Sequence, residues 1–309
     1  MYIEQGYKGN LGLWKYAFIP LGFLALMVFN YISTIMSPVP VEDYMQQLID
    51  KLGSNTVLVI LLAPLVVGLF LVLGWTKLVH EQSITSLTTS RKAIDWRRIF
   101  YAFTVWGLIT AGMTYAYILF APENYVFNFQ MKPFLTLAII SLLLIPLQTS
   151  FEEYLFRGHL MQGLGILTKN RWFPLVVTSV LFGVMHLGNP EVSKLGYGIM
   201  VYYIGTGFFL GILTLMDEGL ELALGFHAAN NLITALLVTA DWTAFQTESI
   251  YRDISEPSLS WDGLIPVFVI FPLLLYVFSV KYKWTDWTEK LFGRVLTEEE
   301  FKSLPENEQ

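Results

Sequence analysis

Two adjacent carboxylates and a guanidinium lie at the end of a long apolar run. Glu152, Glu153 and Arg157 belong to the stretch Thr149-Ser-Phe-Glu-Glu-Tyr-Leu-Phe-Arg-Gly-His159, and the run before it, Pro133 to Leu147, has the composition of a membrane helix. Ionisable side chains inside a membrane are costly unless they are paired or hydrated, and they mark functional sites by default. These three residues are therefore the first candidates for chemistry.

Helix geometry gives the two acids different roles. Arg157 follows Glu153 by four residues, so the two side chains share a helix face and can form an ion pair. Glu152 is turned about 100° away on the same helix. We therefore expect Glu153 and Arg157 to form a structural pair, which leaves Glu152 free for chemistry. The alternative is that both acids only pair with Arg157 or cap a helix junction.

A histidine ends the next apolar segment, in Phe182-Gly-Val-Met-His186. The polar turn between the two segments centres near Lys169, midway in sequence between Glu152 and His186. If two antiparallel helices flank this turn, both side chains lie roughly 25 Å from it. An acid and an imidazole at matched depth can activate a water molecule. The alternative for a lone histidine in an apolar helix is a hydrogen-bonded core residue.

A third polar set occurs in Gly225-Phe-His-Ala-Ala-Asn-Asn231. His227 and Asn231 are four residues apart and share a helix face. Both side chains can donate hydrogen bonds, as an oxyanion site requires. The two alanines between them would let another helix or a substrate backbone approach closely. The alternative is an interhelical polar clamp, and Asn230 is a rival for the amide role.

The two remaining histidines have weaker signals. His80 begins His-Glu-Gln-Ser-Ile84, which lacks the second histidine of a zinc-protease HExxH motif, so we interpret it as a solvated residue at the membrane boundary. His159 either lines the approach to the site or is a polar residue of the core. The chain has no cysteine and no G-x-S-x-G string, which excludes a thiol nucleophile and a serine elbow.

Composition defines the elements that must position these residues. The 309-residue chain is 54% hydrophobic and 14% charged, whereas soluble domains carry about 25% charged residues. The apolar residues form long blocks without strand-like alternation. We predict an all-α polytopic membrane protein of about eight transmembrane helices, with the catalytic site inside the helical bundle. The predicted spans are Trp14–Ile35, Thr56–Trp75, Ile99–Phe120, Phe134–Leu167, Trp172–Leu187, Tyr197–Met216, Leu220–Thr239 and Leu264–Val280.

The distribution of charge predicts the orientation. The loop from Thr76 to Arg98 is the most basic and is expected in the cytoplasm, and the acidic loops 37–55 and 241–263 are expected on the other side. Both termini are then cytoplasmic, with residues 1–12 as a short polar tail and the first apolar block as a retained helix. The net charge of −6 gives no indication of a nucleic-acid partner.

The chain is predicted to form one integrated membrane domain in three parts. Residues 1–132 form an N-terminal three-helix membrane region, 133–240 a catalytic core, and 241–309 the last transmembrane helix with a cytoplasmic amphipathic tail. In that tail, one helix face with Trp284, Trp287 and Leu291 is expected at the membrane interface, and Thr297 with Glu300 is expected to form a capping box.

Three ordered motifs resemble those of a known family. Glu152-Glu153-x-x-x-Arg157, Phe182-x-x-x-His186 and His227-x-x-x-Asn231 are similar to the motifs of the CPBP (CAAX protease and bacteriocin-processing, or Abi) family. That family groups CAAX-type prenyl endopeptidases with bacteriocin-processing and bacteriocin-immunity proteins. The resemblance extends from about Ile145 to Leu237. It implies a membrane-embedded, glutamate-dependent endopeptidase that cleaves a peptide or membrane-protein substrate, lipidated or not, at or in a bacterial plasma membrane.

The resemblance also implies roles for the site residues. Glu152 would be the general base, and His186 would hold and polarise the attacking water. His227 and Asn231 would stabilise the oxyanion. The pair behind them, Glu153 and Arg157, would orient the first motif.

No cofactor is expected, because a buried carboxylate can activate water without a metal. Zinc held by Glu152, His186 and His227 is the second choice, since no acid is evident in the sequence beside either histidine to orient it. A different class of function is a catalytically inactive immunity or scaffold protein of the same fold. A transporter with a proton relay is less favoured, because the chain shows no internal repeat.

Overall fold

Long apolar helices dominate the computed structural model, which describes residues 1–259 and 261–305. Within these residues, six helical segments are long and apolar enough to cross a membrane. Each contains a predicted span, so the protein is an all-α polytopic integral membrane protein. The six segments are α1 (Leu13–Met36), α3 (Ser54–Leu78), α5 (Trp96–Phe120), Met131–Thr168, Tyr197–Asp217 and Gly263–Tyr282.

Three of these segments combine more than one helix. The first joins α6 (Met131–Glu153), the π-helical η3 (Tyr154–Leu160) and α7 (Met161–Thr168). The second joins η4 (Tyr197–Ile199) to α10 (Met200–Asp217). The third runs through α12 (Trp261–Ile265), the π-helical η5 (Pro266–Ile270) and α13 (Phe271–Tyr282).

The fifth and seventh predicted spans correspond to shorter helices. α8 (Trp172–Val184) has 13 residues and α11 (Glu221–Leu237) has 17. At 1.5 Å per residue they are about 20 and 26 Å long, less than the roughly 30 Å of a hydrocarbon core. α11 packs against α5 and α6, and α8 packs against α10. Both helices therefore lie largely within the bundle and bring polar residues to its interior.

The π-helical segment η3 begins directly after Glu153. All seven of its residues are buried, Arg157 among them. The wider π turn is uncommon and is found most often at functional sites. Behind it, Gly207 lets α10 approach α8, because a Cβ there would lie 2.5 Å from the backbone oxygen of Ser179. The helix junction and this close contact therefore pack beside the residues of the first motif.

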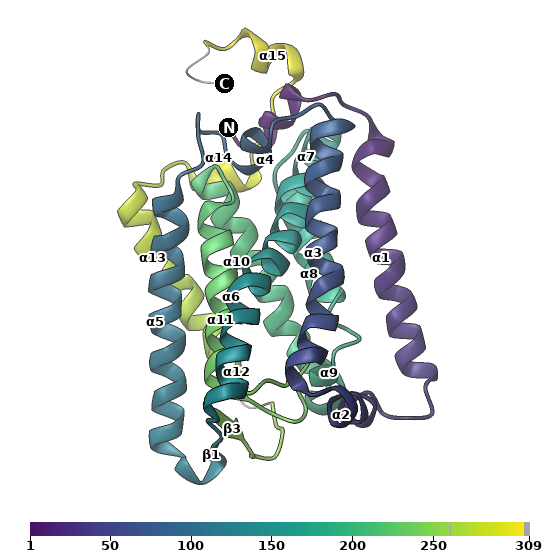
Figure 1. Ribbon diagram of the computed structural model, residues 1–309. Helices are drawn as coiled ribbons and strands as arrows, with labels where there is room; N and C mark the ends of the chain where they lie inside the picture. The colour runs from purple at the N-terminus through teal and green to yellow at the C-terminus, as the bar shows by residue number, and fades with distance from the viewer. Residues whose placement is uncertain (260, 306–309) are drawn as a thin grey trace.

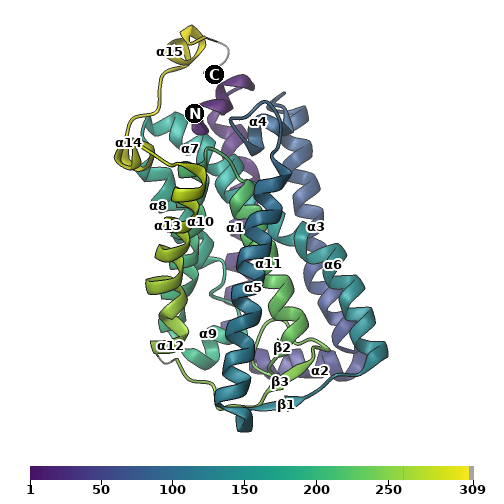
Figure 2. The ribbon, with the colours of Figure 1, turned by 90° about the vertical axis from the view of Figure 1, so that its left-hand side faces the viewer.

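The two ends of the molecule differ in structure. Figure 1 shows both termini at one end, together with α4 (Ile84–Thr88), α14 (Trp287–Phe292) and α15 (Glu298–Ser303). The opposite end carries α2 (Val41–Leu52), α9 (Pro190–Leu195) and three short strands, as the rotated view in Figure 2 also shows. The two ends are called here the terminal end and the α2 end.

Three short strands accompany the helices of this all-α fold. β1 (Tyr125–Phe127) follows the short helix η2 (Pro122–Asn124) and pairs antiparallel with β3 (Tyr251–Asp253). β3 also pairs in parallel with β2 (Val238–Thr239), in the order β1-β3-β2. These strands join loops outside the long apolar helices and are too short to show strand periodicity in the sequence.

The first twelve residues were expected to form a short polar tail, but residues 2–7 are buried. They contain the 3-10 helix η1 (Ile3–Lys8), in which Glu4 is fully buried and pairs with Arg171 at 2.7 Å. The Tyr2 hydroxyl donates to the backbone oxygen of Leu87 at 2.7 Å. The partners of Glu4 and Tyr2 lie far away in the sequence, and no local sequence signal reveals them.

The predicted acidic loop 37–55 contains the amphipathic helix α2. It begins after Pro40, with Glu42 in its first turn, where a negative charge favours the helix dipole. In the tail, the capping box of Thr297 and Glu300 is confirmed. Trp284 precedes α14, so it does not share one helix face with Trp287 and Leu291 as expected.

Candidate active site

The predicted site residues come from three neighbouring segments. Glu152 and Glu153 end α6, His186 lies in the turns that follow α8, and His227 lies in the middle of α11. Because α11 packs along α6, the acids of one helix face the histidine of the other.

The predicted ion pair between Glu153 and Arg157 is confirmed. Arg157 Nη1 donates to Glu153 Oε1 at 3.0 Å, and both side chains are fully buried. Arg157 Nη2 donates to the backbone oxygen of Gly207 at 3.0 Å. Its guanidinium also lies 4.3 Å from the centre of the Phe182 ring. Arg157 thus connects the end of α6 to α8 and α10.

Glu153 has a second partner that the sequence did not indicate. Its Oε1 lies 2.7 Å from His227 Nδ1. A carboxylate already bonded to Arg157 can only accept, so we assign the hydrogen to Nδ1. His227 Nε2 then faces Glu152 Oε2 at 3.7 Å. The expectation that no acid lies beside His227 was therefore wrong, because the acid comes from another helix.

Glu152 retains one unpaired oxygen. The residue is 4% exposed, and its Oε1 accepts a hydrogen bond from Gln148 Nε2 at 2.5 Å. Its Oε2 is shielded from solvent and has no hydrogen-bond partner among the described residues. The split between a braced Glu153 and a freer Glu152 agrees with the helix geometry, although the catalytic roles of both residues stay predictions.

Gln148 is a site residue that sequence reasoning missed. Its Oε1 accepts from Asn231 Nδ2 at 3.2 Å, so it connects Asn231 to Glu152. The chain of amides continues, since Asn230 Nδ2 donates to Asn231 Oδ1 and Trp106 Nε1 donates to Asn230 Oδ1, each at 3.1 Å. The available signal was an amide four residues before Glu152 in an otherwise apolar run.

His186 is held by its own helix end and by an aromatic ring. Its Nδ1 donates to the backbone oxygen of Phe182 at 2.8 Å, and its ring stacks on Tyr203 with centroids 4.3 Å apart. The Phe182 ring lies 5.1 Å from His186 and 5.7 Å from His227. With Nδ1 engaged, the remaining lone pair of His186 is on Nε2.

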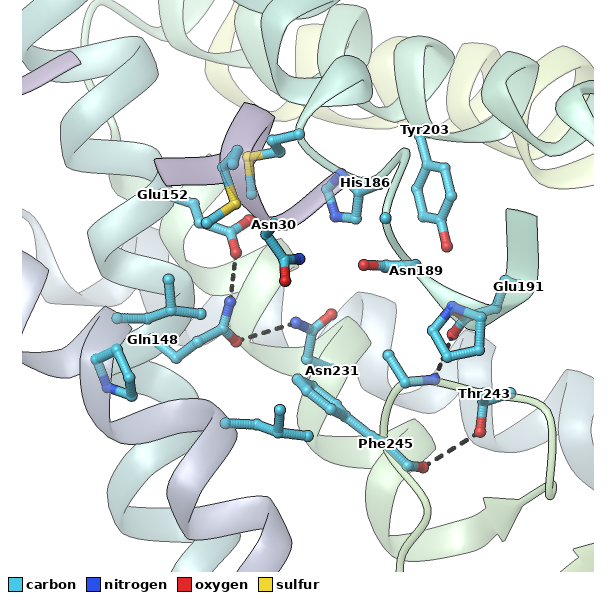
Figure 3. Close-up of a pocket in the computed structure, with 18 of the residues that line it drawn as sticks. Asn30, Gln148, Glu152, His186, Asn189, Glu191, Tyr203, Asn231, Thr243 and Phe245 are labelled. Atoms are coloured by element: carbon cyan, nitrogen blue, oxygen red, sulfur yellow. Dashed lines mark hydrogen bonds between the residues drawn. The ribbon is translucent and has the colours of Figure 1, made fainter. Parts of the chain in front are cut away.

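Several polar side chains of the predicted site line one large cavity. Its volume is about 1290 Å³, and Glu152, His186, His227 and Asn231 all line it. Figure 3 shows Glu152, Gln148 and Asn231 along one wall, with His186 and Tyr203 on the adjoining one. Residues of α1, α2 and α3 supply the apolar walls, and the cavity extends toward the α2 end.

Charge balance indicates that the buried cluster holds one additional proton. Two carboxylates and one guanidinium would leave a net negative charge in a buried cluster, which is costly. One additional proton, carried by either Glu152 or His227, would make the cluster neutral. With that proton on His227, Nε2–H is a donor and Glu152 is a carboxylate. The arrangement can therefore accept one proton and donate another.

The three residues considered as zinc ligands all line the cavity. Among the described residues, no group of three or more histidine, aspartate or glutamate side chains is arranged to hold a metal ion. Glu152 and His227 offer two atoms 3.7 Å apart, and Glu153 braces His227 as an outer carboxylate braces a zinc ligand. His186 Nδ1 is bonded to the backbone oxygen of Phe182. His186 does not join Glu152 and His227 in a three-ligand group.

The other two histidines lie together in the core. His80 is fully buried, and its Nδ1 lies 3.1 Å from the backbone oxygen of Asn10, so the prediction of a solvated residue was wrong. His159 is also buried and packs against Tyr16 and His80 with ring centroids 5.1 Å away from each. This contact supports the core alternative for His159.

Comparison with known proteins agrees with the motif pattern. A family model described as type II CAAX prenyl endopeptidase Rce1-like matches residues 131–233, a range that includes every predicted site residue. The chain is 31% identical over 259 residues to the uncharacterized protein YyaK of Bacillus subtilis (strain 168), covering 82% of this chain and 84% of YyaK. The chain belongs to the CPBP family. No solved structure matches it.

Membership of this family supports a membrane protease-type function. The family match and the six apolar helices also place the chain in a lipid bilayer. Because YyaK is itself uncharacterized, it adds no substrate or activity. The identity of the reaction in this protein must therefore be argued from the site.

Proposed function

We propose that this protein is a glutamate-type intramembrane endopeptidase that hydrolyses a peptide bond inside its cavity. The observation that carries the proposal is the contact of 3.7 Å between Glu152 Oε2 and His227 Nε2, with Glu153 bonded to the far side of the imidazole. An acid and an oriented imidazole that open onto one cavity form an acid–base pair. The substrate is a peptide or membrane protein, with or without a lipid group.

In the proposed mechanism, a water molecule binds between Glu152 Oε2 and His186 Nε2. Glu152 takes one proton from the water, and the resulting hydroxide attacks the carbonyl carbon of the scissile bond. The oxyanion accepts hydrogen bonds from His227 Nε2–H and Asn231 Nδ2–H. Glu152 then passes its proton to the leaving nitrogen as the C–N bond breaks, which regenerates the carboxylate.

The surrounding residues act by positioning. Arg157 and Glu153 hold His227 in the orientation that directs Nε2 toward Glu152. Gln148 holds the other oxygen of Glu152 and the amide of Asn231. A fixed array of donors is worth more in catalysis than a mobile one, because no reorganisation is needed as charge develops.

The three predicted parts of the chain, 1–132, 133–240 and 241–309, are proposed to work as one domain. Side chains of α1 and α3 line the cavity that holds Glu152, so the first part completes the site built by the second. We also propose that both termini are cytoplasmic in a bacterial plasma membrane, with the basic loop 76–98 on the same side. The α2 end of the cavity then faces the outside.

A cleavage assay with Glu152→Gln tests the function. The purified protein in phosphatidylglycerol nanodiscs would be incubated with a library of internally quenched peptides. We expect wild-type cleavage and a fall in kcat of about 10²–10⁴-fold in Glu152→Gln, which keeps an acceptor for Gln148 but cannot take a proton. The matched control is Glu123→Gln, which removes the same charge from an exposed side chain.

Cleavage by Glu152→Gln at the wild-type rate would refute the base assignment. If no peptide is cut, comparing the membrane proteomes of cells with wild-type protein and with Glu152→Gln decides between protease and scaffold. Proteins truncated only in the wild type support the protease. Identical proteomes with a partner bound equally by both variants would instead support the inactive immunity or scaffold protein.

A further inference from the structure

A second acid lies across the cavity from Glu152. Glu191 is in the first turn of α9, and its Oε1 accepts a hydrogen bond from the backbone N–H of Ala244 at 2.8 Å. Its Oε2 is shielded from solvent and has no hydrogen-bond partner in the residues that the structure describes. Figure 3 shows Glu191 beside Thr243, on the far side of the cavity from Gln148. One carboxylate oxygen is therefore fixed, and the other is available to a ligand.

Two aromatic side chains line the same cavity as this acid. They are Tyr203 and Trp242, and Figure 3 shows Tyr203 beside His186, above Asn189. The indole nitrogen of Trp242 is buried and lacks a hydrogen-bond partner in the protein. A carboxylate next to aromatic rings favours a cation, through a charge-assisted hydrogen bond and through the faces of the rings.

Acids outnumber the permanently charged bases along the cavity wall. Glu152, Glu191 and Asp253 line it, and no lysine or arginine does so within the described part of the chain. Lys194, which lies on α9 as well, pairs with Glu42 of α2 at 2.9 Å. A cleft lined by acids attracts cations, and the free Glu191 oxygen repels a carboxylate. The cavity thus disfavours a substrate that ends in a free carboxylate near Glu191.

We propose that Glu191 is a specificity residue that binds a lysine or arginine side chain of the substrate. This proposal rests on the proposed function, since it places the cationic residue close to the scissile bond. Glu191 and His186 line the same cavity, so a peptide bound across it places the cation within a few residues of the cleaved bond. The substrate class is then an internal peptide segment with a basic residue next to apolar ones.

Burial raises the pKa of the Glu191 carboxyl in the free protein. A bound ammonium or guanidinium group offsets that effect, because an opposite charge nearby favours the ionised form. A cationic ligand therefore lowers the energetic cost of ionising Glu191.

Matched peptides test the subsite. The probes are internally quenched peptides that differ only by lysine or norleucine at one position, scanned over three residues on each side of the cleaved bond. Phosphatidylglycerol nanodiscs are used because their headgroups carry no amine. At one position, we expect lysine to raise kcat/KM by about tenfold over norleucine, the value of one charge-assisted hydrogen bond.

Substitutions at Glu191 then identify its role. Glu191→Gln keeps the acceptor for Ala244 and should bring the lysine-to-norleucine ratio close to one, and Glu191→Lys should make a glutamate peptide better than the lysine peptide. The control Glu123→Gln should leave the ratio unchanged. A ratio that Glu191→Gln does not alter would overturn the proposal, as would an equal loss for both peptides.

A binding experiment separates this proposal from the proposed function. The Kd of each peptide is measured by fluorescence anisotropy on Glu152→Gln protein and on the Glu152→Gln, Glu191→Gln double variant. We expect tighter binding of the lysine peptide only where Glu191 is present. If the wild type cleaves nothing but this difference in Kd is seen, the protease fails and the cation subsite stands. If lysine and norleucine peptides bind alike, the subsite is rejected.

Discussion

Two clusters of buried ionisable side chains in this protein are built differently. At the terminal end, Asp217 and Glu221 face Arg91 and Arg98. Arg91 lies 3.1 Å from each acid, Arg98 also pairs with Asp217, and the backbone N–H of Asp95 donates to Glu221 at 3.2 Å. Every side-chain polar atom of the two acids and two arginines has a partner or contact with solvent.

The cluster in the middle of the bundle is incomplete. It has two acids and one arginine, and Glu152 Oε2, Glu153 Oε2 and Arg157 Nε are buried without hydrogen-bond partners in the protein. The cavity reaches Glu152 but none of the residues of the terminal cluster. Burying a charge is costly in both places. Full pairing at the terminal end is what stability requires, whereas partial pairing beside a cavity leaves groups available for chemistry.

The first prediction tests whether the terminal cluster serves stability and not catalysis. Asp217→Asn should lower the free energy of unfolding by about 3 kcal/mol, the lower end of the range for removing one member of a buried pair, because its two arginines remain partly exposed. The kcat per folded molecule should not change. Urea unfolding in micelles, followed by tryptophan fluorescence, gives the stability, and the quenched peptides give kcat.

Glu152→Gln is the matched counterpart. It removes one of two negative charges from a cluster with a single arginine, so the free energy of unfolding should stay the same or rise while kcat falls. If Glu152→Gln unfolds as readily as Asp217→Asn, or if Asp217→Asn abolishes cleavage in the folded fraction, the two clusters do not differ in the way described.

Local periodicity predicted the parts of this arrangement that lie on one helix. The spacing of Glu153 and Arg157 indicated their ion pair, and the spacing of Thr297 and Glu300 indicated the capping box. The apolar blocks predicted the long helices for the same reason, since membrane burial acts on each segment separately. Ion pairs, caps and apolar helices of this kind can be predicted from the sequence of one segment alone.

Contacts between distant segments could not be predicted in this way. His227 is 74 residues from Glu153, and Glu4 is 167 residues from Arg171. Each pair is decided by how helices pack, and a single sequence does not report packing. The polar first residues and His80 were expected at the surface for that reason, although both are buried. Polarity indicates exposure only when no distant partner exists.

The second prediction concerns Gln148, a neutral residue of the incomplete cluster. Gln148→Leu should lower kcat by about 10–100-fold, because a hydrogen bond to a charged group is worth about 1.5–3 kcal/mol. KM should change little, since the substitution acts on the position of Glu152 and not on substrate binding. A rise in KM together with a lower urea midpoint of unfolding would indicate a structural role instead.

The smallest expected effect comes from removing metal ions. The terminal cluster needs no ion because arginines complete it, and the middle cluster lacks three ligands around one point. Exhaustive chelation with 1,10-phenanthroline should therefore change neither kcat nor the urea midpoint of unfolding. Loss of cleavage that added Zn²⁺ restores would show that the helices move to bring His186 to Glu152 and His227, and the unpaired Glu152 Oε2 would then be a ligand atom. A proton on Glu152 or His227 balances the charge of the cluster in the first case, and a metal cation does so in the second.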